Sequence, residues 1–229
     1  MRSLRDLYTQ IPQDDDKLKR FGSEVFLNRD GTSLVDSTGS RDMPADLPVG
    51  PDYVLGPGDG LTINLWGGVS QSFTRFVDPE GKIILPEAGA LVVAGLTLQH
   101  AQLNIERALK EQFHNVQADV SIARLRSVRV YVVGDVQRPG AYEVSSLSTP
   151  LNALYAAGGP TGIGSLRIVR HYRGAQLIRE TDLYDFLLHG VRMDGERLQS
   201  GDTLLVPPAG SQVAVFGMVK RPAIYELKG

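Results

Sequence analysis

Residues 130–144 read VYVVGDVQRPGAYEV, and residues 213–227 read VAVFGMVKRPAIYEL. Both stretches contain a β-branched run, a turn at Arg-Pro and a second apolar run, which is the pattern of a β-hairpin. Six residues recur with one offset of 83 positions: Gly134, Val136, Arg138, Pro139, Tyr142 and Glu143 return as Gly217, Val219, Arg221, Pro222, Tyr225 and Glu226. A hairpin repeated at a fixed spacing indicates a modular chain. We therefore expect one complete module over residues 127–210 and the start of a second, truncated copy over residues 211–229.

The segment between the two hairpins predicts the rest of the complete module. Thr149 and Pro150 are typical of a helix start, and Gly158 is typical of a helix stop. Asp182 and Gly190 bound a second helix in the same way. The predicted order is β-β-α-β-β-α-β, with strands near residues 128–133, 141–144, 167–171, 177–179 and 204–206.

A different module is expected over residues 53–126. The apolar runs 53–55 and 61–66 predict two strands, joined by a turn made of Gly56, Pro57, Gly58, Asp59 and Gly60. Further strands are predicted at residues 73–77, 82–85 and 118–125, and Thr97 caps an amphipathic helix that covers the sheet. Strands and helices in both modules place the chain in the α+β class, with a mixed sheet in this first module.

The two modules also share a short turn motif. Gly58-Asp59 precedes one strand and Gly201-Asp202 precedes another. We interpret both aspartates as turn residues that accept backbone N–H bonds. In the first repeated hairpin, Pro139 fixes its own φ, and Gly140 is expected to supply the positive φ of a type II turn. Ala223 replaces that glycine in the second hairpin, which favours a type I turn there.

The two ends of the chain are the least patterned parts. Residues 1–52 are rich in Asp, Ser, Gly and Pro toward their end, which predicts an arm or linker. Residues 211–229 contain only a first hairpin, so we expect the chain to be a piece of something longer. We expect this hairpin to fray, or to pair with the preceding module or a neighbouring chain through its open strand edge.

Bulk composition excludes several classes of protein. The 24 basic and 26 acidic residues nearly cancel, which argues against nucleic-acid binding through bulk charge. The chain has no cysteine, so disulfides, thiolate metal sites and cysteine nucleophiles are excluded. The chain contains no run of about 18 apolar residues, so no membrane helix is predicted.

Motifs for catalysis and cofactors are also missing. The glycine-rich turn at residues 56–60 runs from strand to strand, without the helix start and Lys-Ser/Thr of a phosphate loop, and no Gly-x-Ser-x-Gly sequence appears. The histidines have no metal-ligand spacing between them: they are His100, His114, His171 and His189. We therefore expect no catalytic residue, no cofactor and no metal.

Three groups of residues are candidates for binding. Arg138 with Tyr142, repeated as Arg221 with Tyr225, brings a guanidinium and an aromatic ring to a hairpin, where they could contact a sugar or a neighbouring subunit. The alternative is an exposed turn arginine and a tyrosine that caps the apolar side of the hairpin. Arg167, Arg170 and Arg173 place three positive charges near one strand and its turn, and the alternative is a solvated strand edge. Trp66 could stack on a sugar, and the alternative, which we expect, is burial in the core.

These motifs resemble those of the outer-membrane polysaccharide export proteins of Gram-negative bacteria. The first module is similar to their export domain through DYVLGPGD at residues 52–59, LWG at 65–67 and DPEGKI at 78–83. The second is similar to their soluble-ligand-binding β-grasp (SLBB) domain through VG at 133–134, RPGAY at 138–142, AGG at 157–159 and Gly201-Asp202 before Val206-Pro207. The resemblance covers roughly residues 21–227.

The resemblance implies the periplasmic part of an export protein attached to the outer membrane. It implies a ring-shaped homo-oligomer that conducts capsular polysaccharide or exopolysaccharide, received from an inner-membrane co-polymerase. Contact with the membrane would come only through parts outside this sequence. Two other hypotheses stay open: a stand-alone carbohydrate- or ligand-binding protein that uses its β-grasp modules as pockets, and an enzyme acting on polysaccharide.

Overall fold

The computed structural model describes residues 18–26, 49–113, 115–190 and 197–228, which form two compact units. The upstream unit comprises the described residues of 49–128 together with 143–147. The downstream unit comprises residues 18–26 and the described residues of 129–142 and 148–228. Helices and strands occur in both units, which confirms the α+β class.

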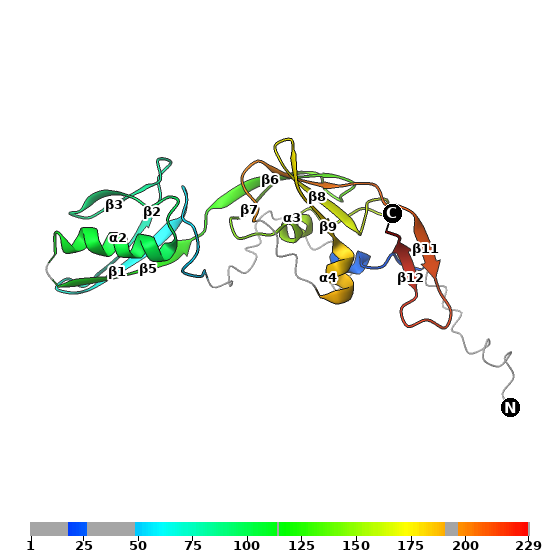
Figure 1. Ribbon diagram of the computed structural model, residues 1–229, viewed down its shortest axis with the longest axis horizontal. Coiled ribbons are helices and arrows are strands. Elements are labelled where there is room, and N and C mark those ends of the chain that lie inside the picture. The colour runs from blue at the N-terminus through cyan, green and yellow to red at the C-terminus, as the bar shows by residue number, and fades with distance from the viewer. Residues whose placement is uncertain (1–17, 27–48, 114, 191–196, 229) are drawn as a thin grey trace, which may run out of the picture. The chain divides into compact units, whose positions relative to one another are not determined.

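The upstream unit is a helix packed on a small sheet, whose strands are all antiparallel and not mixed as predicted. Its elements are β1 (Gly60–Gly67), β2 (Gln71–Phe76), β3 (Lys82–Leu85), β4 (Gly89–Val92), α2 (Leu98–Lys110) and β5 (Val116–Arg124). The sheet has the order β2-β1-β5, and β3 pairs with β4 in a separate hairpin. In Figure 1, α2 runs along β1 and β5, and β3 lies on the same side of these strands.

Alternation along β1 explains how this core forms. Leu61, Ile63 and Leu65 are buried against α2, and the residues between them point away from the helix. Thr97 caps α2 by accepting a hydrogen bond from the backbone N–H of His100 at 3.2 Å, as predicted. Trp66 lies on the outward side of β1 and is 45% exposed. The expectation that Trp66 is a core residue is therefore wrong, because its odd spacing from Leu61, Ile63 and Leu65 turns it away from α2.

Two other details of the upstream unit differ from the predictions. The apolar run 53–55 forms only an isolated bridge, between Val54 and Thr97. Its side chains belong to the core, since Tyr53 and Leu55 are buried, but its backbone bonds are made to the loop before α2. Strand β4 was not predicted, because its sequence Gly89–Val92 lacks an alternating pattern.

The downstream unit contains a five-stranded sheet of order β7-β6-β10-β8-β9. Its elements are β6 (Ser127–Gly134), β7 (Gly140–Ser145), α3 (Pro150–Ala156), β8 (Ile168–Arg173), β9 (Gln176–Asp182), α4 (Leu183–His189) and β10 (Asp202–Val206). The predicted order β-β-α-β-β-α-β is confirmed. β10 pairs in parallel with β6 and antiparallel with β8, so the sheet is mixed. The predicted C-terminal stop of α4 is also confirmed, because Gly190 adopts a left-handed conformation with φ of 66°.

The turns of the repeated hairpins differ from the predicted ones. Gly140 is already the first residue of β7 and has no positive φ, so the predicted type II turn is wrong. The positive φ occurs instead at the glycine that recurs in both hairpins, Gly134 with 87° and Gly217 with 90°. Ala223 can therefore replace Gly140 in the second hairpin without backbone strain. The glycine that is kept in both hairpins is the one whose backbone requires it.

The second hairpin pairs with a segment from the other end of the chain. It consists of β11 (Gln212–Val215) and β12 (Ala223–Glu226). Residues 19–21, which precede the short 3-10 helix η1 (Ser23–Phe26), run parallel to β12: Phe21 N–H donates to Ile224 O, and Ile224 N–H donates to Lys19 O. This segment lies within the predicted arm, of which residues 1–17 and 27–48 are outside the described residues. The strand edge of the second hairpin is therefore paired, but its partner is this N-terminal segment, whereas the preceding module or a neighbouring chain was expected.

Candidate functional site: buried carboxylates and a repeated hairpin

Asp59 is the fully buried centre of a polar cluster in the upstream unit. Its carboxylate accepts hydrogen bonds from the backbone N–H groups of Gly56 at 2.9 Å and Arg126 at 2.8 Å, and from the Tyr53 hydroxyl at 2.8 Å. The Arg126 guanidinium forms an ion pair with it. Ser146 Oγ completes the cluster at 2.8 Å from the Tyr53 hydroxyl. Burial raises the pKa of Tyr53 to about 12, and the hydrogen bond to Asp59 raises it too, against the lowering effect of Ser146.

Asp202 is likewise the buried centre of a polar cluster, in the downstream unit. Its buried carboxylate accepts bonds from Gln199 N–H at 2.8 Å and from Arg173 Nε at 2.9 Å, and it lies 2.7 Å from His171 Nε2. Burial alone would raise the pKa of Asp202, but the bonds from Arg173, Gln199 and His171 hold it below the usual value. The carboxylate is therefore ionised and fully used by structural bonds.

The two aspartates share one local geometry. Each accepts a bond from the backbone N–H three residues earlier and donates its own N–H to the same residue's carbonyl oxygen. Each follows a glycine of positive φ, Gly58 with 93° and Gly201 with 91°. Each also pairs with an arginine outside its turn, Arg126 or Arg173, and no sequence motif predicted that partner.

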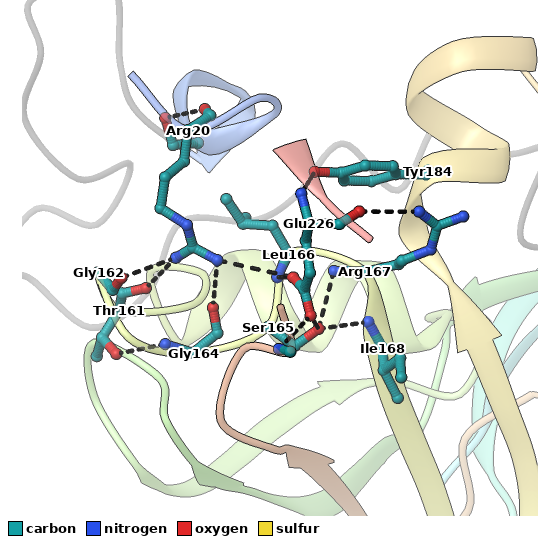
Figure 2. Close-up of polar contacts among 12 residues, drawn as sticks. Arg20, Thr161, Gly162, Gly164, Ser165, Leu166, Arg167, Ile168, Tyr184 and Glu226 are labelled. Carbon is teal, nitrogen blue, oxygen red and sulfur yellow. Dashed lines mark hydrogen bonds and ion pairs between the residues drawn. The ribbon is translucent and has the colours of Figure 1, made fainter. Parts of the chain in front are cut away.

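A third buried carboxylate, Glu226, joins separate parts of the downstream unit, and Figure 2 shows the groups around it. Its Oε1 accepts bonds from Ser165 Oγ at 2.7 Å and Gly210 N–H at 3.0 Å. Its Oε2 accepts a bond from Leu166 N–H at 3.0 Å and lies 3.7 Å from Arg20 Nη2. Both carboxylate oxygens are therefore surrounded by donors only.

Arg20 brings the N-terminal segment into this cluster. Its guanidinium donates to the carbonyl oxygens of Thr161 at 3.0 Å, Gly162 at 3.0 Å and Gly164 at 2.7 Å, as Figure 2 shows. The next residue, Phe21, stacks on Tyr225 with ring centroids 5.0 Å apart. Arg20 and Glu226 thus fix both residues 18–26 and β12 on the downstream unit. Sequence reasoning missed both residues, because their partners lie far away in the chain.

The repeated arginine–tyrosine pairs have a clear structural use. The Tyr142 hydroxyl donates to the carbonyl oxygen of Arg138, and the Tyr225 hydroxyl donates to that of Arg221 at 2.9 Å. Each tyrosine side chain therefore bonds to the backbone of its own hairpin turn, four residues earlier in the chain. The Arg138 guanidinium donates to Ala156 O at 3.2 Å, at the end of α3. The two pairs lie on different hairpins, and their role in contacting a sugar or a subunit stays a prediction.

Comparisons with known proteins match both units. The model of the polysaccharide biosynthesis/export protein family matches residues 47–123, and that of the SLBB domain matches residues 129–184. The chain belongs to the polysaccharide export family. The polysialic acid transport protein KpsD of Escherichia coli is 32% identical over 212 residues, which are 92% of this chain and 36% of the relative. The EPS I polysaccharide export outer membrane protein EpsA of Ralstonia solanacearum is 30% identical over 227 residues, 96% of this chain and 58% of the relative. The chain therefore spans between about a third and three fifths of the length of these relatives.

The arginines of β8 in the SLBB domain are used in ion pairs. Arg170 pairs with Glu180 at 2.8 Å, and Arg173 pairs with Asp202. Arg167, just before β8, pairs with Asp182 at 2.8 Å. The expectation of a solvated sheet edge is wrong, because β8 lies between β10 and β9 and its charges are balanced by acids on those neighbours.

The described residues contain no group of three or more His, Asp or Glu side chains that could hold a metal ion. His171 is buried against Asp202, while His100 and His189 are exposed. His114 lies outside the described residues. Within the described part of the chain, no helix is both long and apolar enough to cross a membrane.

The hairpin tyrosines lead to a first prediction. Tyr142→Phe and Tyr225→Phe should each lower the free energy of unfolding by about 0.5–1 kcal/mol, because each removes one hydrogen bond and keeps the ring. Urea denaturation of both variants measures this, with Tyr131→Phe, an exposed position on β6, as the control. Unchanged stability together with weakened saccharide binding would instead support the binding role of the two pairs.

Proposed function

We propose that this chain is the periplasmic part of an outer-membrane polysaccharide export protein. The observation that carries the proposal is an export domain followed directly by an SLBB domain, each with the fold that its motifs predict. The relatives named as transport or export proteins match across both domains, not across one alone. The cargo would be a capsular polysaccharide or an exopolysaccharide.

The same proposal gives the protein a conducting role and no catalytic one. Asp59, Asp202 and Glu226 are buried, and each is used by several structural hydrogen bonds. A general acid or base needs a carboxyl group that can reach a substrate. We expect the assembled protein to be a ring-shaped homo-oligomer at the outer membrane, supplied by an inner-membrane co-polymerase. Closed rings need two complementary faces on each subunit.

The experiment that tests this function is deletion of the gene in its own host. Polysaccharide on the cell surface and in the medium should fall to background, while polymer accumulates inside the cell envelope. Re-expression of the gene should restore secretion. Undiminished secretion by the deletion strain would overturn the proposal. Turnover of polysaccharide by the purified protein would support the enzyme hypothesis instead.

The ring is tested separately. The mass of the whole gene product, purified in detergent, should be a multiple of the subunit mass. A monomer under these conditions would contradict the ring. Tight, saturable binding of oligosaccharide by a monomer would favour the stand-alone binding protein, because a conduit that binds its cargo tightly would stall transport.

A further inference from the structure

The sheet of the export domain has one face that α2 does not cover. Because side chains alternate along strands, the residues between the buried positions of β1 and β5 share this face with every second residue of β2. We call it the outer face. Its members are Thr62, Asn64, Trp66, Ser72, Thr74, Phe76, Gln117, Asp119, Ser121 and Arg124.

Two exposed aromatic rings lie at opposite ends of the outer face. Trp66 is 45% exposed near one end of β1, and Phe76 is 57% exposed beside Gly60 at the other end. Gly60 makes room for the ring, since a Cβ there would come within 2.9 Å of a Phe76 ring carbon. Trp66 lies six positions along the strand from Gly60, which corresponds to roughly 20 Å. The spacing leaves room for several sugar rings between the two aromatic residues.

The surface between the rings is polar and nearly uncharged. Asn64 accepts a hydrogen bond from Ser72 Oγ at 2.7 Å, and Trp66 donates its indole N–H to Gln117 Oε1 at 2.7 Å. These bonds hold the amide groups and the indole ring in place. The charged residues of the outer face are Asp119, opposite Asn64, and Arg124, which flanks Gly60 on the side away from Phe76. Their charges cancel.

This chemistry selects among ligand classes. Nucleic acid and anionic lipid need clustered cations, which the outer face does not have. A hydrophobic protein partner needs a continuous apolar centre, whereas here the centre is made of hydroxyl and amide groups. Sugar rings present apolar C–H faces and many hydroxyl groups, which match exposed aromatic rings separated by hydrogen-bonding side chains.

We propose that the outer face of the export domain is the surface along which a polysaccharide slides, with Trp66 and Phe76 as stacking platforms for mainly neutral sugar rings. The proposal rests on the proposed export function and adds the contact surface and the class of sugar. The contacts are expected to be weak, because hydrogen bonds exchanged with water contribute little net free energy. Weak and repeated contacts allow the chain to move on.

The sequence provides a direct probe, since Trp66 is the only tryptophan among the 229 residues. Isomalto-oligosaccharides, which are neutral, should change the intensity and wavelength of its fluorescence and protect it from iodide quenching. Amide NMR spectra should show the largest shifts in β1, β2 and β5. Oligomers of α2,8-linked sialic acid, which are anionic, should produce smaller changes at equal concentration.

Variants then separate the surface from the function. Trp66→Ala should weaken isomalto-oligosaccharide binding about tenfold by NMR titration, and Phe76→Ala should weaken it to a lesser extent. Tyr131→Ala, at an exposed tyrosine of the SLBB domain, should leave it unchanged. Equal binding by Trp66→Ala, or shifts confined to other strands, would overturn the outer face as the contact surface, even if the deletion strain has lost secretion.

A second copy of the chain could instead cover the outer face. In that case Trp66→Ala would reduce the oligomer mass measured by light scattering and leave oligosaccharide shifts unchanged, which would also overturn the proposal. A full loss of secretion on gene deletion, combined with partly reduced secretion by a Trp66→Ala, Phe76→Ala strain, supports both the function and the surface. Normal secretion by that double variant counts against the surface alone.

Discussion

Replacing Glu226 with alanine is expected to lower the free energy of unfolding of the SLBB unit by about 3 kcal/mol or more. The change leaves Leu166 N–H and Gly210 N–H without their acceptor and leaves Arg20 beside an empty space. Buried donors that lose their partners cost more than the bond itself contributed. Thermal and urea denaturation measure the loss. Hydrogen exchange should show that residues 19–21 and 223–226 lose protection before the five-stranded sheet does.

The repeat supplies a matched control for this experiment. Glu143 occupies the position of Glu226 in the first hairpin, yet it is exposed. Glu143→Ala should therefore change stability by less than about 0.5 kcal/mol. Glu226→Gln should also destabilise, because an amide NH2 group would face donors wherever it is placed. Similar small effects at residues 143 and 226 would show that the cluster in Figure 2 does not hold the second hairpin in place.

The same pair of glutamates shows what sequence reasoning can reach. The repeat correctly predicts two hairpins, since turn residues and β-branched runs act over a few neighbouring positions. It places residues 143 and 226 at equivalent positions, yet Glu143 is exposed and Glu226 is buried. What buries Glu226 is Arg20 and the loop at residues 161–166, which no local pattern connects to it. Local chemistry is visible in the sequence, whereas contacts across the chain are not.

Strand alternation could have placed Trp66 correctly. Leu61, Ile63 and Leu65 occupy the inward positions of β1, so an even-numbered neighbour faces outward. A tryptophan side chain is usually buried, whereas the two-residue alternation of β1 predicts an exposed side chain at position 66. The structure follows the alternation. The distinction matters for function, because a buried tryptophan stabilises a core while an exposed one, held by a hydrogen bond to Gln117, can bind a ligand.

The interpretation of the turn aspartates was correct but incomplete. A Gly-Asp turn predicts a carboxylate that accepts backbone N–H bonds, and both units show one. Neither turn predicts the arginine that joins it from another segment, Arg126 for Asp59 and Arg173 for Asp202. These arginines explain why a fully buried aspartate is tolerated, since an unpaired buried charge is costly. They also determine how much stability each aspartate should contribute.

Asp59→Ala is expected to destabilise the export domain by about 3–5 kcal/mol, because it leaves the Arg126 guanidinium and the Tyr53 hydroxyl without their buried partner. Chemical denaturation followed by Trp66 fluorescence reports on this unit specifically, since no other tryptophan is present. Asp52→Ala, at an exposed aspartate seven residues earlier, is the control and should have little effect. Equal stability of the two variants would contradict a central role for Asp59.

Alkaline pH tests the same cluster from the side of Tyr53. Burial and the hydrogen bond to Asp59 raise its pKa from 10.0 in the unfolded chain to about 12 in the folded one. A group whose pKa is raised on folding contributes its full stabilisation below the unfolded pKa and loses it as the pH rises toward the folded pKa. The export domain should therefore lose stability between about pH 10 and pH 12. Tyr53→Phe should be less stable at neutral pH and should lose less stability over that interval.

Tyrosinate absorbance, compared between wild type and Tyr53→Phe, should show one tyrosine that ionises late in the wild type, and Asp59→Asn should make it ionise earlier. If wild type and Asp59→Asn give the same tyrosinate titration curve, Tyr53 is not held neutral by this cluster.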